Sequence, residues 1–150
     1  MVTVLAGVGI NRRKLRRRLV RAGYQTAWVG NTLSVSPDIG QGTVSITTLT
    51  VSELPEGVAE SARELLGFRP RDGITCGFDG RPGESVAWPT VIDVARAVAA
   101  QVPLAVLDDH AGTLYLIHPG RGLIGPEEYR KLRSRNSTAD LLRGLLGDRN

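Results

Sequence analysis

Residues 12–21 constrain the fold more than any other segment, because a helix of this composition has only one narrow apolar stripe to bury. Leu15 and Leu19 are four residues apart and lie on one face of the predicted helix, whereas seven of the ten side chains are basic. Asn11 is a favourable N-cap, and Gly23 follows the last turn as a stop signal. Such a helix can dock on a sheet, so we expect a sheet beside it.

Short strand-like runs and two further helices surround this segment. The predicted strands cover residues 2–8, 24–29, 32–36, 43–51, 73–78 and two runs within 104–118. The predicted helices cover residues 56–67 and 89–102, with shorter helical pieces over 126–135 and 139–146. This order favours an α+β fold, with a mainly antiparallel sheet and helices packed on one face, in a ferredoxin-like or βαββ-type arrangement.

Two local details follow from the strand runs. Gly30-Asn31 between two of them predicts a two-residue hairpin loop. Within 43–51, the apolar positions change phase after Ile46, which predicts a β-bulge near Thr47-Thr48 if the whole run is one strand.

The chain has the size and composition of one domain. Its 150 residues are 41% hydrophobic, which is enough for one core, so we expect a single α+β domain over 1–150 with 136–150 as a loosely packed C-terminal helix. The first residues lack the basic start and long apolar stretch of a signal peptide, which predicts a cytoplasmic protein with no membrane contact. Cys76 is the one cysteine and is expected to be a buried, inert thiol, so no disulfide or CxxC metal site is predicted.

Charge is segregated along the chain. Residues 1–21 carry seven basic and no acidic side chains, whereas residues 22–120 carry five basic and eleven acidic ones. Like charges three and four residues apart destabilise a helix, so something outside the basic helix should neutralise its charge. The candidates are the acidic body of the protein (residues 22–120), an acidic partner protein or a nucleic acid. The nucleic-acid or phosphate-binding alternative uses Arg12, Arg13, Lys14, Arg16, Arg17 and Arg18. The acidic body and the lack of aromatic residues among these arginines count against it.

Motifs for catalysis are weak. The segment 7–12 resembles a dinucleotide-binding loop, but Arg12 occupies the third glycine position and the first acidic residue downstream is Asp38. The cluster 107–112, Leu-Asp-Asp-His-Ala-Gly, has the composition of a tight turn, and an acid–base or metal site there is the lesser reading. An enzyme therefore ranks third among the function classes, and no cofactor or metal is expected.

Residues 91–122 resemble the helix, strand, Leu-Asp-Asp turn and strand of small α/β immunity-type proteins from bacterial, often actinobacterial, polymorphic toxin systems. The resemblance implies a protein that binds and blocks a cognate toxin, with Asp108, Asp109 and His110 as contacts. Trp88, at the end of the loop 81–88, is a further candidate anchor for a partner. The leading prediction is thus a non-enzymatic protein-binding module, with nucleic-acid or phosphate binding as the alternative.

Overall fold

The computed structural model describes residues 1–7, 9–38, 40–50, 53, 57, 60, 63–64, 70–102, 105–111, 113–125, 127–128 and 131. Its elements in chain order are β1 (Val2–Ala6), α1 (Arg12–Arg21), β2 (Tyr24–Val29), β3 (Thr32–Pro37), β4 (Val44–Thr50), β5 (Asp72–Gly77), α3 (Trp88–Ala99), β6 (Ala105–Asp108), β7 (Leu114–His118) and β8 (Gly122–Ile124). The helices expected over 56–67, 126–135 and 139–146, and the loose packing expected of 136–150, fall largely or wholly outside these residues.

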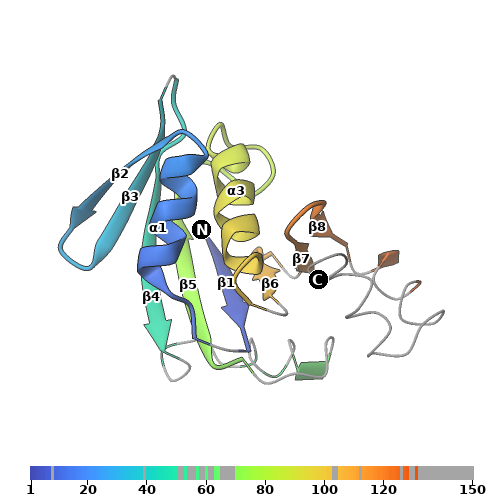
Figure 1. The fold of residues 1–150 in the computed structure, drawn as a ribbon. Helices are drawn as coiled ribbons and strands as arrows, with labels where there is room; N and C mark the ends of the chain where they lie inside the picture. The colour runs from blue at the N-terminus through green and yellow to red at the C-terminus, as the bar shows by residue number, and fades with distance from the viewer. Residues whose placement is uncertain are drawn as a thin grey trace.

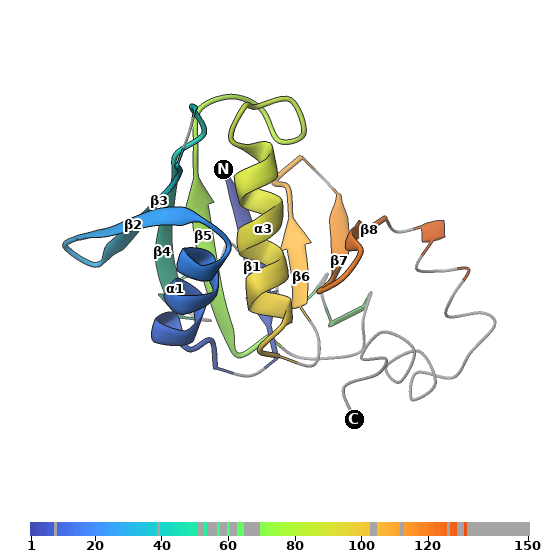
Figure 2. The same cartoon turned by 45° about the horizontal axis from the view of Figure 1, so that its top comes forward.

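The described strands form one antiparallel sheet with the order β2-β3-β4-β5-β1-β6-β7-β8. Helices α1 and α3 lie side by side on one face of it, as Figures 1 and 2 show. The expected α+β class is confirmed. The four central strands β4-β5-β1-β6, in which β1 separates the two strands joined through α3, have the split order of a ferredoxin-like unit. The hairpin β2-β3 extends this unit at one edge and β7-β8 at the other.

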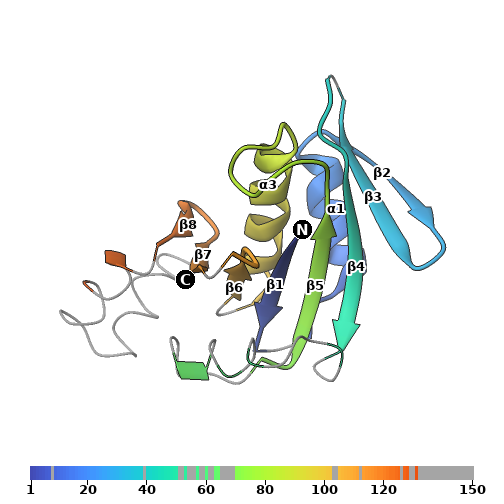
Figure 3. The same ribbon diagram turned by 180° about the vertical axis from the view of Figure 1, so that it is seen from behind.

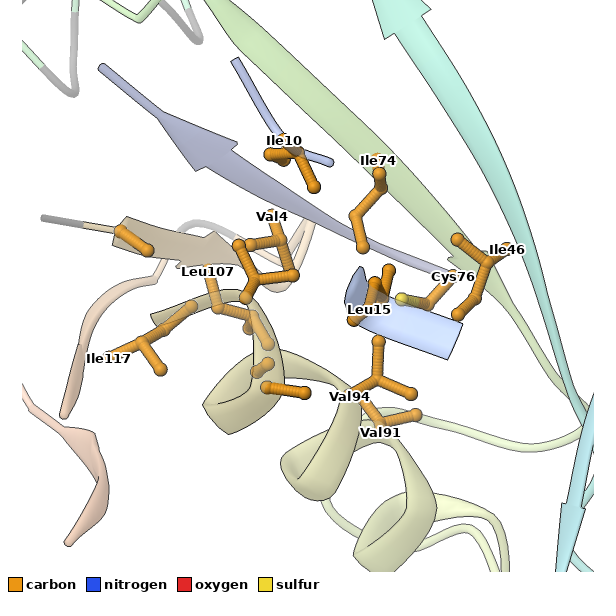
Figure 4. Packing of buried hydrophobic residues seen from close by; sticks show 14 of the residues in the cluster. Val4, Ile10, Leu15, Ile46, Ile74, Cys76, Val91, Val94, Leu107 and Ile117 are labelled. Carbon is orange, nitrogen blue, oxygen red and sulfur yellow. The ribbon is translucent and has the colours of Figure 1, made fainter. Parts of the chain in front are cut away.

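The core lies between the two helices and the sheet. Leu15 and Leu19 of α1 are 1% exposed, and Val91 and Val94 of α3 are fully buried. Figure 4 shows Leu15, Val91 and Val94 facing side chains of the central strands. The strand residues in this cluster include Val4, Ile46, Ile74, Cys76 and Leu107. Since burying a Leu or Val side chain contributes about 1.5–3 kcal/mol, this packing fixes which face of α1 points inward.

The ends of α1 are set by the residues that the sequence indicated. The side chain of Asn11 accepts a hydrogen bond from the backbone N–H of Lys14 over 3.1 Å, which satisfies one of the free donors of the first turn. Gly23 has φ of 98°, a left-handed conformation that ends the helix and that a side chain would disfavour. Both predictions are confirmed.

The hairpin β2-β3 has the two-residue loop that Gly30-Asn31 predicts. Val29 pairs with Thr32 across the loop. Gly30 has φ of 62°, and Asn31 is not among the described residues with positive φ, as a type II′ turn requires.

The β-bulge predicted near Thr47-Thr48 is wrong. Strand β4 pairs with β5 in an unbroken register from Ser45 opposite Gly77 to Thr50 opposite Asp72. The apolar residues change phase because both faces of the sheet bury apolar side chains. Leu49 lies in a row with Leu5, which is fully buried on the face away from the helices. That face is seen in Figure 3, and β8 is an additional strand that the sequence pattern did not reveal.

Candidate functional site

Helix α1 and edge strand β2 lie along each other in opposite directions. The guanidinium of Arg12 is 5.5 Å from the ring centroid of Trp28, and Arg16 Nε donates a hydrogen bond of 3.0 Å to Thr26 Oγ1. Four residues along the helix therefore correspond to two residues back along the strand. This alignment brings one row of arginine side chains over the outer strand of the sheet.

Two adjoining cavities lie in this region. The larger, of about 600 Å³, is lined by Ile10, Asn11, Arg12, Arg13, Trp28, Gly30 and Asn31. The smaller, of about 400 Å³, is lined by Arg13, Arg16, Arg17 and Trp28. Because they share Arg13 and Trp28, they form one depression, which we call the basic groove, with Arg12, Arg13, Arg16, Arg17 and Trp28 as its defining residues. Among the described residues that line it, none is acidic.

The charge of α1 is not neutralised by acidic side chains of the residues that the structure describes. No basic side chain of α1 comes within ion-pair distance of an acidic side chain in the part of the chain that the structure describes; the ion pair found there joins Arg96 to Asp93 within α3, at 3.9 Å. Of the three ways in which the helix charge could be neutralised, pairing with the acidic body is therefore not used by the described residues. The remaining two are a nucleic acid and an acidic protein.

The six basic residues predicted for the nucleic-acid alternative do not act as one set. Arg12, Arg13, Arg16 and Arg17 line the basic groove. Lys14 and Arg18 are exposed, are four residues apart, and are absent from the groove lining. This division offers a matched pair of positions for experiments.

Trp28 is the site residue that the sequence analysis missed. Trp28 is 44% exposed and is one of the large hydrophobic residues that remain at the surface. Its place follows from the two-residue alternation of β2, since Trp28 pairs with the buried Leu33 and so points to the face that carries α1. The alternation along β2 can be predicted from the sequence. That Trp28 belongs to a site cannot, because this depends on the docking of α1 on the same face.

The turn that follows β6 brings the predicted contacts Asp108, Asp109 and His110 together, but uses their polar groups internally. Asp108 and Asp109 are 8% and 9% exposed. One carboxylate oxygen of Asp108 accepts the N–H of His110 at 2.9 Å, and one of Asp109 accepts two backbone N–H groups further along the turn at 2.8 and 3.0 Å. His110 has φ of 59°, which these bonds hold in place. The carboxylates thus serve the turn and present little surface to a partner.

His110 also joins the turn to β1. Its Nε2 lies 2.7 Å from the hydroxyl oxygen of Thr3, a side chain that is 1% exposed. The pair has a hydroxyl and an imidazole at hydrogen-bond distance, but the hydroxyl is buried beneath the turn, so a substrate has no access to it. The contact holds the turn against the sheet.

Trp88 and Cys76 are part of the packed interior and its margin. The Trp88 ring lies 6.3 Å from that of Phe78, centroid to centroid, and both rings pack against the core cluster. Cys76 is fully buried, as predicted, and burial raises the pKa of its thiol to about 12. A thiol in this state is a poor nucleophile.

Within the described residues, no three His, Cys, Asp or Glu side chains are close enough to hold a metal ion together. No helix in that part of the chain is long and apolar enough to cross a membrane. Comparison of the chain with protein-family models, curated proteins and solved structures finds no match to any of them.

Proposed function

We propose that the protein is a protein-binding module that takes an acidic segment of its partner into the basic groove. The observation that supports this most strongly is the surplus of charge on α1. Seven basic side chains lie in ten residues, and none pairs with an acidic side chain of the described domain. Because such crowding costs helix stability, an external anion that relieves it gains interaction energy without competing with an internal pair.

The groove also has the composition of a binding hot spot. Arginine and tryptophan are the residues that most often dominate protein interfaces, and here four arginines surround one half-exposed indole. An acidic segment with some apolar side chains would be complementary to both features.

The resemblance of residues 91–122 to immunity-type proteins gives this proposal a biological form, in which the partner is a toxin domain in the bacterial cytoplasm. The groove changes which surface we assign to the partner. The charge-complementary surface is basic and lies on α1 and β2, whereas the carboxylates of the 108–110 turn are occupied by backbone donors.

Single-stranded nucleic acid is the second candidate, and one observation favours it. Trp28 supplies the aromatic surface for base stacking that the sequence of α1 lacks, next to arginines that can contact phosphates. The net negative charge of residues 22–120 opposes a long polyanion. A protein partner carries its acidic groups on a limited surface and meets less of this repulsion.

Two double charge reversals with equal net charge test the proposal. Arg13→Glu/Arg17→Glu alters the groove, and Lys14→Glu/Arg18→Glu alters the exposed positions outside it. Fluorescence anisotropy would measure the binding of labelled polyglutamate and of labelled oligo-dT at several salt concentrations. We expect the groove variant to lose polyglutamate binding and the control variant to keep most of it.

Equal losses in the two variants would contradict the proposal, because they would reduce binding to a general attraction for anions. Tighter binding of oligo-dT than of polyglutamate, with a steep salt dependence and a loss on Trp28→Ala, would replace it with the nucleic-acid candidate.

A further inference from the structure

We propose that β2 binds the acidic segment as an added β-strand, in which acidic side chains at every second position face α1. This inference rests on the proposed function and specifies how the partner is held. Strand addition at a sheet edge uses backbone hydrogen bonds for affinity and alternate side chains for specificity. Strand β2 has both features: free backbone groups along its outer edge and arginine side chains that can select alternate residues of the added strand.

The outer edge of β2 has free backbone groups at known positions. In a hairpin with a two-residue loop, the pair that closes the loop exchanges hydrogen bonds, and every second pair along the ladder does the same. Val29, Ala27 and Gln25 therefore bond to β3. Trp28, Thr26 and Tyr24 direct their N–H and C=O groups away from β3. Pro37, which lacks an N–H, lies opposite Tyr24, at a pair that needs no such donor.

This edge has none of the usual protection against strand pairing. Natural sheets protect exposed edges with charged residues, proline, bulges or very short strands. Strand β2 has six residues, Tyr-Gln-Thr-Ala-Trp-Val, with no charge and no proline, and it pairs with β3 without a bulge. It lies at the outer limit of the sheet in both views of Figures 1 and 3. At the opposite limit, β8 has three residues.

The arginines of α1 repeat with nearly the spacing of alternate residues in a strand. Four helical residues advance by about 6 Å, and two strand residues advance by about 7 Å. The contacts of Arg12 with Trp28 and of Arg16 with Thr26 show that this correspondence holds between α1 and β2. Arg13 and Arg17, which also are four apart, line the same groove. An added strand with carboxylates at alternate positions would place them in step with these two arginines.

Electrostatics favours one part of β2, residues 26–29, and one kind of added strand, an acidic one. Asp38 accepts a hydrogen bond from Gln25, and Asp93 accepts one from Tyr24, so the beginning of β2 lies close to carboxylates. The part from Thr26 to Val29 lies beneath the arginines instead. A second copy of this chain pairing through β2 would bring two basic helices towards each other, which like-charge repulsion disfavours. An acidic strand of a partner is instead attracted by the basic side chains of α1.

Three labelled synthetic peptides test the inference on the unmodified protein. The first alternates Glu with Thr, the second has the same composition with the Glu residues in one block, and the third is the alternating peptide with N-methyl groups on alternate backbone amides, placed on the edge that would pair with β2. We expect the alternating peptide to bind about tenfold more tightly than either of the others, since each lost backbone bond or misplaced carboxylate weakens binding. Amide exchange measured by NMR should slow at Thr26 and Trp28 when the alternating peptide is bound.

Equal affinity of the methylated and unmethylated peptides, or binding without slower exchange at those two amides, would overturn the strand-addition model. If the Arg13→Glu/Arg17→Glu variant still loses polyglutamate binding in that case, the proposed function stands and only this inference fails. If the variant binds polyglutamate as the unmodified protein does, the proposed function itself is wrong.

Discussion

Replacing Arg17 with Glu should stabilise the fold while it removes binding to acidic partners. Arg17 is exposed and lies one turn from three like charges: Arg13, Lys14 and Arg21. Each such pair destabilises a helix by about 0.2–0.5 kcal/mol, and an opposite charge stabilises it by a similar amount. Reversing the charge of residue 17 turns all three repulsive pairs into attractive ones. After allowance for screening, we expect the free energy of unfolding to rise by about 1–2 kcal/mol at low salt.

The gain is large enough to measure. For a domain of this size it corresponds to a rise in melting temperature of roughly 2–8 °C. Urea unfolding at low ionic strength and at about 0.5 M salt would separate charge from packing, because the gain should shrink at high salt. Arg17→Gln, which removes the repulsion without adding attraction, should give about half of the effect.

A loss of stability in Arg17→Glu at low salt would refute this reasoning. It would mean that the guanidinium is already paired within the folded protein, and that α1 has no charge left for a partner. A gain that persisted unchanged at high salt would point to helix propensity or packing in place of electrostatics.

Three further outcomes follow from single contacts. Asn11→Ala removes the side chain that accepts the Lys14 N–H, and should lower the unfolding free energy by about 1 kcal/mol in urea titrations. Gly42→Ala should destabilise the protein by about 1–3 kcal/mol, because φ there is 131° and an added Cβ would lie 2.9 Å from the Val86 carbonyl oxygen; unchanged stability would mean that the loop moves aside. Cys76 should resist thiol reagents in the native state. Its pKa is raised from 9.0 to about 12 by folding, so stability should fall as the pH rises above 9, by up to about 1.4 kcal/mol per pH unit, and Cys76→Ala should lessen that fall.

The sequence predicted most of the described fold, because its local signals agree with one another. The cap at Asn11, the stop at Gly23 and the stripe formed by Leu15 and Leu19 all define the same helix. The phase change after Ile46 does not indicate a bulge, because an apolar residue on a strand does not say which face of the sheet is buried. In this sheet both faces bury apolar side chains, so Leu49 needs no bulge.

The candidate site was only half predictable. The charge on α1 is evident in the sequence, and so is its lack of internal acidic neighbours. Which arginines share a surface, and that this surface includes Trp28, depends on the docking of the helix beside β2. The reverse holds for Asp108 and Asp109. Their carboxylates look available to a partner in the sequence, but in the structure they accept hydrogen bonds from backbone N–H groups of their own turn.

The most direct test of this account is an amide chemical-shift titration of the ¹⁵N-labelled protein with the alternating Glu-Thr peptide. The account predicts that the shifts concentrate in 12–21 and 24–29 and leave the turn 108–111 unaffected. Shifts that concentrate at that turn or in the loop 81–88, with α1 and β2 unchanged, would contradict it.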